Sequence, residues 1–226
     1  MRKSWRPPVD LLEEPDAILC TECKNDPCLC EEGPRVMTRV CLSKQKELSI
    51  DSMVNTSFWN SSGIPMSSTE FVQQLYGDIP AFFDSEEELR LLWSDANTRK
   101  GLLEKLAERG YSYEQLDELR KLVHGKDSDL YDVLKHIAYQ RDMVPRSDRA
   151  AFAKTRFDET YSPAQVEFLD FILGQYITTG VTELDADKLT DLLVLKYKSI
   201  PDAKKKLGST ALIRDTFLGF QGGLYV

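Results

Sequence analysis

No stretch of the 226-residue sequence is apolar over the length that a membrane-spanning helix needs. The opening residues, MRKSWRPPVDLLEEPD, include basic side chains but lack the apolar run that follows them in a secretory signal peptide. We therefore expect no membrane segment and a cytoplasmic location. Hydrophobic residues make up 42% of the chain and charged residues 29%, which is ordinary for a globular protein.

The chain also lacks the short motifs that identify many enzymes. No glycine-rich run ends in Gly-Lys-Ser or Gly-Lys-Thr, and no G-x-S-x-G turn occurs. Histidine is present only as His124 and His136, which are too far apart for a His-Glu-x-x-His zinc motif. We expect His124 to cap a helix end and His136 to pack or face solvent. The sequence thus predicts neither a catalytic residue nor a cofactor-binding residue.

Acidic residues are plentiful, but their placement does not indicate a nuclease. A nuclease of the Asp…Glu-x-Lys kind needs acids and a lysine on paired strands, and the predicted strands lack acids at that spacing. The acidic runs at 84–89 and 127–132 are expected at helix N-termini, where negative charge complements the helix dipole.

An excess of positive charge is also missing, since the formal net charge is −8. This excludes a protein whose whole surface binds nucleic acid, but a local basic patch remains compatible with it. Lys204, Lys205 and Lys206 form one basic cluster. A second lies between residues 141 and 156, where the candidate nucleic-acid contacts are Arg146, Arg149, Lys154 and Arg156. The alternative for both clusters is a solvated face.

Cysteine is absent beyond Cys41, and the other four cysteines fall within CTECKNDPCLC. Four thiolates this close can hold one structural zinc in an all-sulfur tetrahedron, and C-x-x-C is standard ligand spacing. The alternative is a cluster of free thiols in a reducing compartment. The candidate metal ligands are Cys20, Cys23, Cys28 and Cys30.

The remaining pattern predicts three regions. Residues 1–34 are rich in proline and acids and are expected to form a flexible tail or linker. Residues 35–65 begin with alternating apolar positions between Val36 and Ile50, which predict a β-hairpin, followed by a polar loop. Residues 66–226 are expected to form a helical domain. The predicted fold class is therefore mostly α, with a short β-hairpin in front.

Capping signals in the sequence predict where several helices begin. Ser67, Ser112 and Ser162 are each followed three residues later by Glu or Gln, the spacing of a capping box. The expected helices span 66–77, 85–95, two short elements within 91–123 that meet near Gly110, 130–138, 161–180, 187–198, 200–208 and 210–220. The segment 141–156 is expected to be a basic connection. Helices this short are not stable alone, so they must bury their apolar stripes against one another.

Four segments carry a resemblance to a known family: WSDANTRK (93–100), DLYDVLKHIAY (129–139), VEFLDFILGQYITTGVTEL (166–184) and the end from Phe217 to Tyr225. From about Phe71 onward the chain resembles the C-terminal helical domain of the R (HsdR) subunit of type I restriction enzymes, in the EcoEI-like group. The four-cysteine cluster is not a feature that this family requires.

The resemblance implies a role in assembly. In the family, the R subunit has an N-terminal nuclease domain and two motor lobes that hydrolyse ATP with Mg²⁺ and move DNA. Its C-terminal domain docks them onto the methyltransferase (HsdM) and specificity (HsdS) subunits, so DNA is met through the assembled complex. The motor and nuclease motifs are absent here, so we expect no catalysis and no ATP binding by this chain alone.

Large aromatic side chains are the candidate anchors for such docking. We single out Trp93, Tyr131, Tyr139 and Phe220, with ordinary core packing as the alternative for each. A different class of function stays open: a DNA-binding accessory module that uses the cysteine cluster and the basic segment 141–156.

Overall fold

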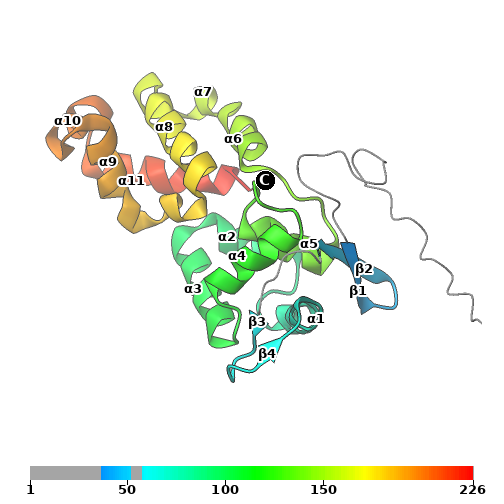
Figure 1. Cartoon of the computed structure of the whole chain (residues 1–226). Coiled ribbons are helices and arrows are strands. Elements are labelled where there is room, and N and C mark those ends of the chain that lie inside the picture. The colour runs from blue at the N-terminus through cyan, green and yellow to red at the C-terminus, as the bar shows by residue number, and fades with distance from the viewer. Residues whose placement is uncertain (1–36, 52–57, 226) are drawn as a thin grey trace, which may run out of the picture.

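The computed structural model describes residues 37–51 and 58–225 of the chain, and this part opens with an antiparallel hairpin (Figure 1). The hairpin pairs β1 (Met37–Ser43) with β2 (Lys46–Asp51), as the alternating pattern predicted. Val40, Leu48 and Ile50 share its buried face, which packs against the first helix. The hairpin tip is fixed to the helical body because Lys46 Nζ donates to the carbonyl oxygen of Ala138 at 2.6 Å.

A second, minimal strand pair leads into the first helix. β3 (Phe58–Trp59) pairs with β4 (Pro65–Met66), and α1 (Ser68–Asp78) follows at once. Ser67 and Glu70 form the predicted capping box. The Phe58 ring stacks on Phe71 with their centroids 4.3 Å apart, so burial of one aromatic pair attaches the strand to α1.

The helices form two groups on either side of the C-terminus (Figure 1). The N-terminal half consists of α1, the 3₁₀ turn η1 (Ile79–Ala81), α2 (Glu86–Ser94), α3 (Ala96–Glu108), α4 (Tyr113–Leu122) and α5 (Leu130–Tyr139). The C-terminal half consists of α6 (Arg146–Lys154), α7 (Phe157–Thr160), α8 (Pro163–Thr179), η2 (Val181–Leu184), η3 (Ala186–Lys188), α9 (Leu189–Tyr197), α10 (Ile200–Leu207) and α11 (Thr210–Gly219).

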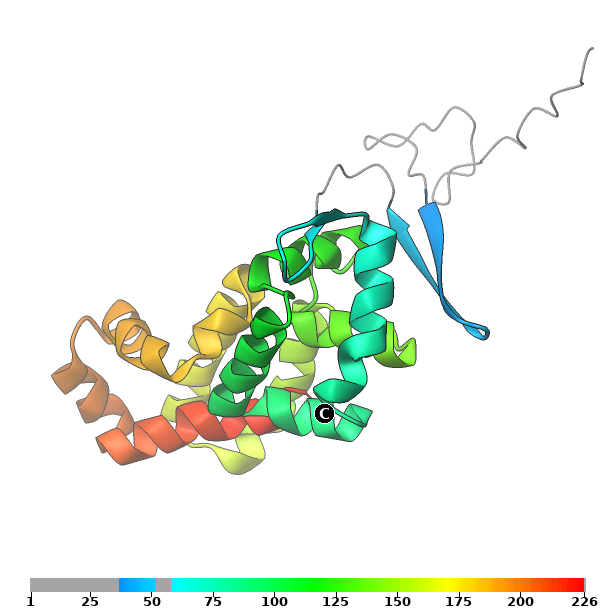
Figure 2. The ribbon, with the colours of Figure 1, turned by 90° about the horizontal axis from the view of Figure 1, so that it is seen from below.

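The last segment of the chain joins the two halves. α11 runs back toward the N-terminal half, and η4 (Phe220–Gly223) packs against α2 (Figures 1 and 2). Buried apolar side chains from both halves belong to one connected core. In the C-terminal half this core is centred on α8, whose Phe168, Ile172 and Tyr176 are fully buried, as its broad apolar stripe predicted.

The segment 141–156 differs from its prediction. Residues 146–154 form α6 rather than a basic connection. The sequence signal is weak there because the buried apolar positions of α6, Ala150 and Ala153, are small. No side chain caps its N-terminus, where Pro145 stands. Packing of α6 against α8 stabilises this helix, although the local sequence has weak helix signals.

Gly110 occupies a backbone position that no other residue accepts easily. It follows α3 with φ of +99°, and a Cβ there would stand 2.8 Å from the backbone nitrogen of Ser61. We predict that Gly110→Ala lowers the free energy of unfolding by more than about 1 kcal/mol. Gly101→Ala is the matched control, since Gly101 lies inside α3 with open space around its Cβ position. That change should stabilise by about 0.5–1 kcal/mol in urea denaturation. Equal effects of the two would contradict this account.

Candidate functional site

A buried acid holds two halves of the molecule together where the chain ends. Asp129 stands at the N-cap of α5, and its Oδ2 accepts hydrogen bonds from the hydroxyls of Tyr176 at 2.6 Å and Tyr225 at 2.8 Å. All three residues are buried. Asp129 also forms a capping box with Asp132. One carboxylate therefore links α5, α8 and the C-terminal segment.

A buried ion pair lies beside this acid. Arg149 of α6 donates through Nη2 to both carboxylate oxygens of Asp132, at 2.7 and 2.8 Å, and through Nη1 to the carbonyl oxygen of Leu224 at 3.3 Å. Its guanidinium also lies 4.6 Å from the ring centroid of Tyr225. Burial raises the pKa of the Asp132 carboxyl above its ordinary value, and the charge of Arg149 opposes that rise.

A second buried arginine fixes η4 to α3. Arg99 Nη2 pairs with Asp185 Oδ1 at 2.9 Å, and Nη1 donates to the carbonyl oxygen of Trp93 at 3.1 Å and to Gln221 Oε1 at 3.3 Å. Gln221 in turn donates to the carbonyl oxygen of Leu184 at 2.8 Å. Residues from three of the segments that carry the family resemblance thus meet in polar contacts that position the end of the chain.

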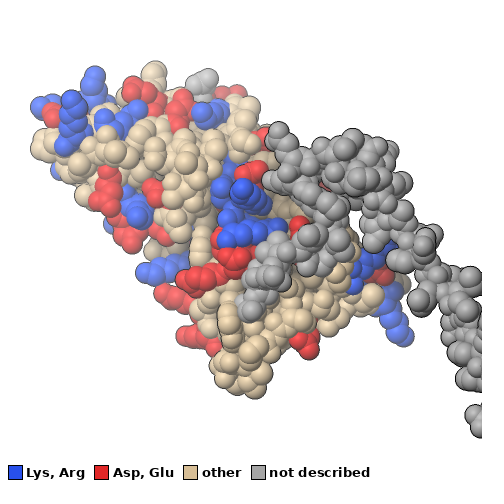
Figure 3. Space-filling model, viewed as in Figure 1, with Lys and Arg blue, Asp and Glu red and all other residues tan. Residues whose placement is uncertain are grey.

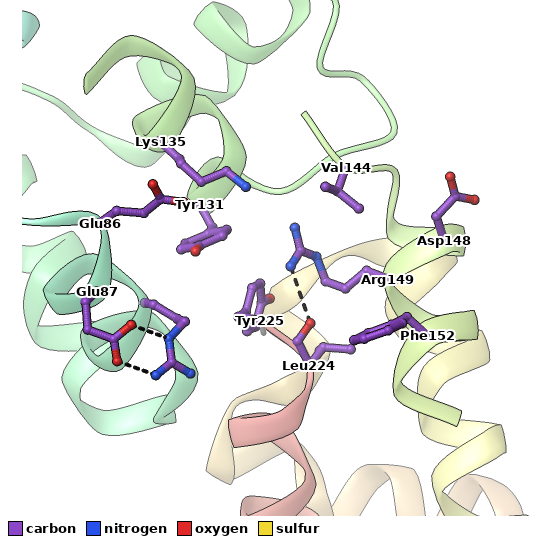
Figure 4. Close-up of a pocket in the computed structure, with 11 residues that line it drawn as sticks. Glu86, Glu87, Tyr131, Lys135, Val144, Asp148, Arg149, Phe152, Leu224 and Tyr225 are labelled. Atoms are coloured by element: carbon purple, nitrogen blue, oxygen red, sulfur yellow. Dashed lines mark hydrogen bonds and ion pairs between the residues drawn. The ribbon is translucent and has the colours of Figure 1, made fainter. Parts of the chain in front are cut away.

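A cleft of about 640 Å³ opens beside Arg149, between α2, α5, α6 and the chain end (Figure 4). Its volume falls within the range of ligand and side-chain pockets, about 300–1,000 Å³. Tyr131 and Lys135 reach it from α5, and Arg149 and Phe152 reach it from α6. Tyr225 forms part of its wall. We call this space the α5–α6 cleft.

Lys135 and Arg149, two cations that line the α5–α6 cleft, each have N–H groups without a hydrogen-bond acceptor in the described residues. Lys135 Nζ lies 3.7 Å from Asp132 Oδ1, which is too far for a hydrogen bond, although its side chain is only 12% exposed. Arg149 is 6% exposed, and its Nε finds no hydrogen-bond acceptor among residues 37–51 and 58–225. A buried donor without an acceptor, as Arg149 Nε is, is uncommon in folded proteins.

Acidic side chains stand around the opening. Glu87 forms an ion pair with Arg90, and Glu86 forms one with Arg141 at 2.9 Å. Asp148 completes the acidic rim. The deep end therefore holds Arg149 and Lys135 beside the buried carboxylates of Asp132 and Asp129, the edge is acidic, and aromatic and aliphatic side chains lie between.

The four predicted docking aromatics are dispersed. Trp93, Tyr131 and Phe220 are buried, and Tyr139 is half-buried. Only Tyr131 lines the α5–α6 cleft. The others contribute to packing, as Phe220 does in its edge-on contact with Phe157. Contact of any of them with a partner stays a prediction.

The predicted nucleic-acid contacts also separate. Arg149 is buried, Arg146 donates through Nε to the carbonyl oxygen of Ile177, and Lys154 pairs with Asp170 at 2.9 Å. Arg156 is exposed, with its guanidinium 4.6 Å from the ring centroid of Phe152. Figure 3 shows basic side chains gathered over α9 and α10, and acids interspersed with bases elsewhere on the face in view. DNA contact by these residues stays a prediction.

The predicted zinc ligands cannot be placed, because Cys20, Cys23, Cys28 and Cys30 lie outside the described residues. The zinc site stays a prediction. Within the described ranges, no three His, Cys, Asp or Glu side chains are grouped to hold a metal ion. His136 Nδ1 lies 2.8 Å from the carbonyl oxygen of Arg141, and His124 follows α4 with φ of +60°. No helix in the described part of the chain combines the length and apolarity that crossing a bilayer demands.

Sequence reasoning did not single out Lys135, Asp129, Asp132 or Tyr225. A usable signal was present for Asp132, which interrupts the apolar stripe of α5 between Leu130 and Val133. A charge within a buried stripe indicates either a paired partner or a site. The partner, Arg149, lies on another helix, so its identity was not available from local pattern.

Comparisons with known proteins agree with the family resemblance. Residues 69–225 match the family described as EcoEI R protein C-terminal. Over 107 residues the chain is 32% identical to the type I restriction enzyme EcoAI endonuclease subunit of Escherichia coli. That alignment covers 47% of this chain and 12% of the relative, so the chain corresponds to a small part of that protein. No solved structure matches the chain.

Proposed function

Because this chain belongs to the EcoEI R protein C-terminal family, we propose that it attaches the motor and nuclease of a type I restriction enzyme R subunit to the methyltransferase subunits. The family match over residues 69–225 is the observation that carries this proposal. In this reading the chain catalyses nothing alone, and DNA and ATP with Mg²⁺ are handled by the assembled enzyme. Its partners would be the HsdM and HsdS subunits, in the cytoplasm.

The architecture supports a binding role. Two helical halves are held together by the buried Arg149–Asp132 pair, by the half-buried Arg99–Asp185 pair and by hydrogen bonds, which gives the surface a fixed shape. Some large apolar side chains remain outside the core, among them Leu91 at 58% exposure and Phe152 at 48%. Apolar anchors within a polar rim are typical of protein–protein interfaces.

Binding to the methyltransferase subunits tests the proposal. We predict that the 226-residue chain binds a purified complex of the cognate HsdM and HsdS subunits with micromolar or tighter affinity, and that moderate salt weakens this binding only slightly. Binding to a short DNA duplex, measured in parallel, should be weaker and should fall steeply with salt. Failure of the subunits to bind at micromolar concentration would contradict the proposal. Tight, salt-sensitive DNA binding in its place would favour a DNA-binding module.

A further inference from the structure

The end of the molecule formed by α9, α10 and α11 is positively charged, although the whole chain carries −8. From Ala186 to Gly219, which spans η3, α9, α10 and α11, the sequence has seven basic and four acidic side chains. Glu167 of α8 adds a fifth carboxylate, because it pairs with Lys196 at 3.0 Å. With all of these counted, this end carries +2 and the remainder of the chain carries −10.

The positive charge is concentrated where α9 ends and on α10, where Figure 3 shows basic side chains gathered. The exposed lysines there form what we call the α10 lysine patch: Lys198, Lys204, Lys205 and Lys206. The buried side chains of α10 are Ala203 and Leu207, so the three consecutive lysines occupy its solvent-facing side. Asp191 lies in the first turn of α9, about 10 Å along the helix axis from Lys198.

Most of the α10 lysine patch has no electrostatic partner within the chain. Lys205 pairs with Asp202 at 2.8 Å, and both of these side chains are exposed. Lys198, Lys204 and Lys206 form no ion pair with any residue that the structure describes. A cation in the last turn of α10 complements the helix dipole, but three consecutive lysines also repel one another. Stability of the fold therefore does not account for the patch.

We propose that the α10 lysine patch binds the phosphate backbone of duplex DNA without reading its sequence. Lysine contacts a phosphate as a point charge, and contacts to phosphates carry no sequence information. This role is additional to docking and does not depend on it. Figures 1 and 2 place α9 and α10 at the opposite end of the molecule from the β1–β2 hairpin, so a duplex bound there leaves the hairpin and α1 uncovered.

A phosphate backbone suits the patch better than an acidic protein surface does. Lysine is depleted in protein–protein interfaces, whereas interfaces with DNA are much more positively charged. A protein partner would instead use apolar side chains, and Val194 and Leu195 of α9 are exposed at 44% and 63%. Variants at Leu195 therefore distinguish the two kinds of partner.

Fluorescence anisotropy of a labelled duplex of about 30 base pairs, titrated with the full chain, tests the proposal. We expect a dissociation constant on the order of 10⁻⁵ M at about 50 mM salt. The logarithm of the association constant should fall with that of the salt concentration with a slope of about −3, as contact with three or four phosphates implies. The triple variant Lys204→Gln, Lys205→Gln, Lys206→Gln should weaken binding about tenfold or more and reduce the slope to about −1.

A second triple variant is the matched control for net charge. Lys44 lies in the turn between β1 and β2, and Lys100 and Lys105 are exposed on α3. Replacing these three by glutamine removes the same charge elsewhere on the molecule and should change DNA affinity less than about threefold, because salt screens distant charges. Both triple variants are first checked for an unchanged thermal transition.

Lys198 separates DNA binding from stability. It follows α9 with φ of +68°, in the left-handed region where glycine is less strained. Lys198→Gly should therefore raise the midpoint of thermal unfolding by about 1–3 °C while weakening DNA binding about threefold or more. A stabilised variant that binds DNA as well as the unaltered chain does would remove Lys198 from the patch and count against the proposal.

The other outcomes are equally distinct. Equal weakening by the two triple variants would show that bulk charge governs binding, and the proposal would be wrong. Unchanged DNA binding by the α10 triple variant would make the patch a solvated face. If that variant and Leu195→Ala weaken binding of the HsdM–HsdS complex and leave DNA binding unchanged, the partner is a protein and the proposal is wrong. Absence of subunit binding by the unaltered chain would overturn docking alone.

Discussion

Replacing Arg149 by methionine should lower the free energy of unfolding by about 3–5 kcal/mol at neutral pH, because it leaves a buried charge without its main partner. Asp132 is fully buried and receives two hydrogen bonds from Arg149 Nη2. Lys135, at 3.7 Å, is the remaining cation and is too distant to replace them. Methionine fills the space of the aliphatic part of the arginine side chain, so the loss reports on removal of the guanidinium, with its charge and its contacts to Leu224 and Tyr225.

The loss should depend on pH in a defined direction. The pKa of Asp132 is already raised above its ordinary value of 3.8 by burial, and without Arg149 it should rise further. A carboxyl with a raised folded-state pKa favours folding when protonated, and that contribution is lost as the pH rises through the folded-state value. The difference between Arg149→Met and the unaltered chain should therefore be largest near neutral pH and shrink as the pH falls toward that value.

Denaturation in urea across a pH series measures this. Lys154→Met is the control, since it breaks the exposed pair with Asp170 and should cost about 0–1 kcal/mol. A loss below about 1 kcal/mol for Arg149→Met at neutral pH, comparable to that exposed pair, would contradict the role assigned to the buried pair.

Truncation of Tyr225 to alanine should lower the free energy of unfolding by about 3–5 kcal/mol, as for other large buried aromatics. The ring packs edge-on against Tyr131 with centroids 5.1 Å apart and lies beneath the Arg149 guanidinium. Its hydroxyl donates to Asp129 at 2.8 Å. One substitution therefore removes apolar packing, a cation–π contact and a hydrogen bond to a buried carboxylate.

A milder substitution at the same position separates the contribution of the hydrogen bond to stability from that of ring packing. Tyr225→Phe keeps the ring and removes only the hydrogen bond, so it should cost about 1.5–3 kcal/mol. Asp129 keeps its bond from Tyr176 at 2.6 Å, which limits the loss. Tyr113→Phe is the control, because Tyr113 is 38% exposed, and it should change stability by less than about 0.5 kcal/mol. Similar losses at positions 225 and 113 would contradict the structural role of the chain end.

Much of the fold follows from local signals in the sequence. Ser67 with Glu70, and Ser162 with Gln165, form the capping boxes that their spacing predicted, because every partner lies within one helical turn. Gln115 shows where such reasoning fails. Its backbone nitrogen donates to Ser112 as predicted, but its side chain donates to the carbonyl oxygen of Trp59 at 2.8 Å rather than bonding back to the cap.

The candidate site depends on contacts that no local pattern contains. Arg149 was grouped with surface cations because composition alone does not distinguish a buried guanidinium from an exposed one. Its partner is on α5, and the carbonyl oxygen of Leu224 comes from the far end of the chain. The α5–α6 cleft arises only when four separate segments meet. The residues that carry the family resemblance were found from the sequence. Their contacts between the two helical halves could not be predicted from it.

Competition with an intact R subunit tests the central claim, docking by this chain, most directly. A type I restriction enzyme is reconstituted from the cognate R, HsdM and HsdS subunits, and DNA cleavage is followed while the isolated chain is added in excess. We predict that the chain displaces the R subunit, so that cleavage falls as its concentration rises and methylation by HsdM and HsdS continues. Unchanged cleavage at a large excess of correctly folded chain would contradict the account.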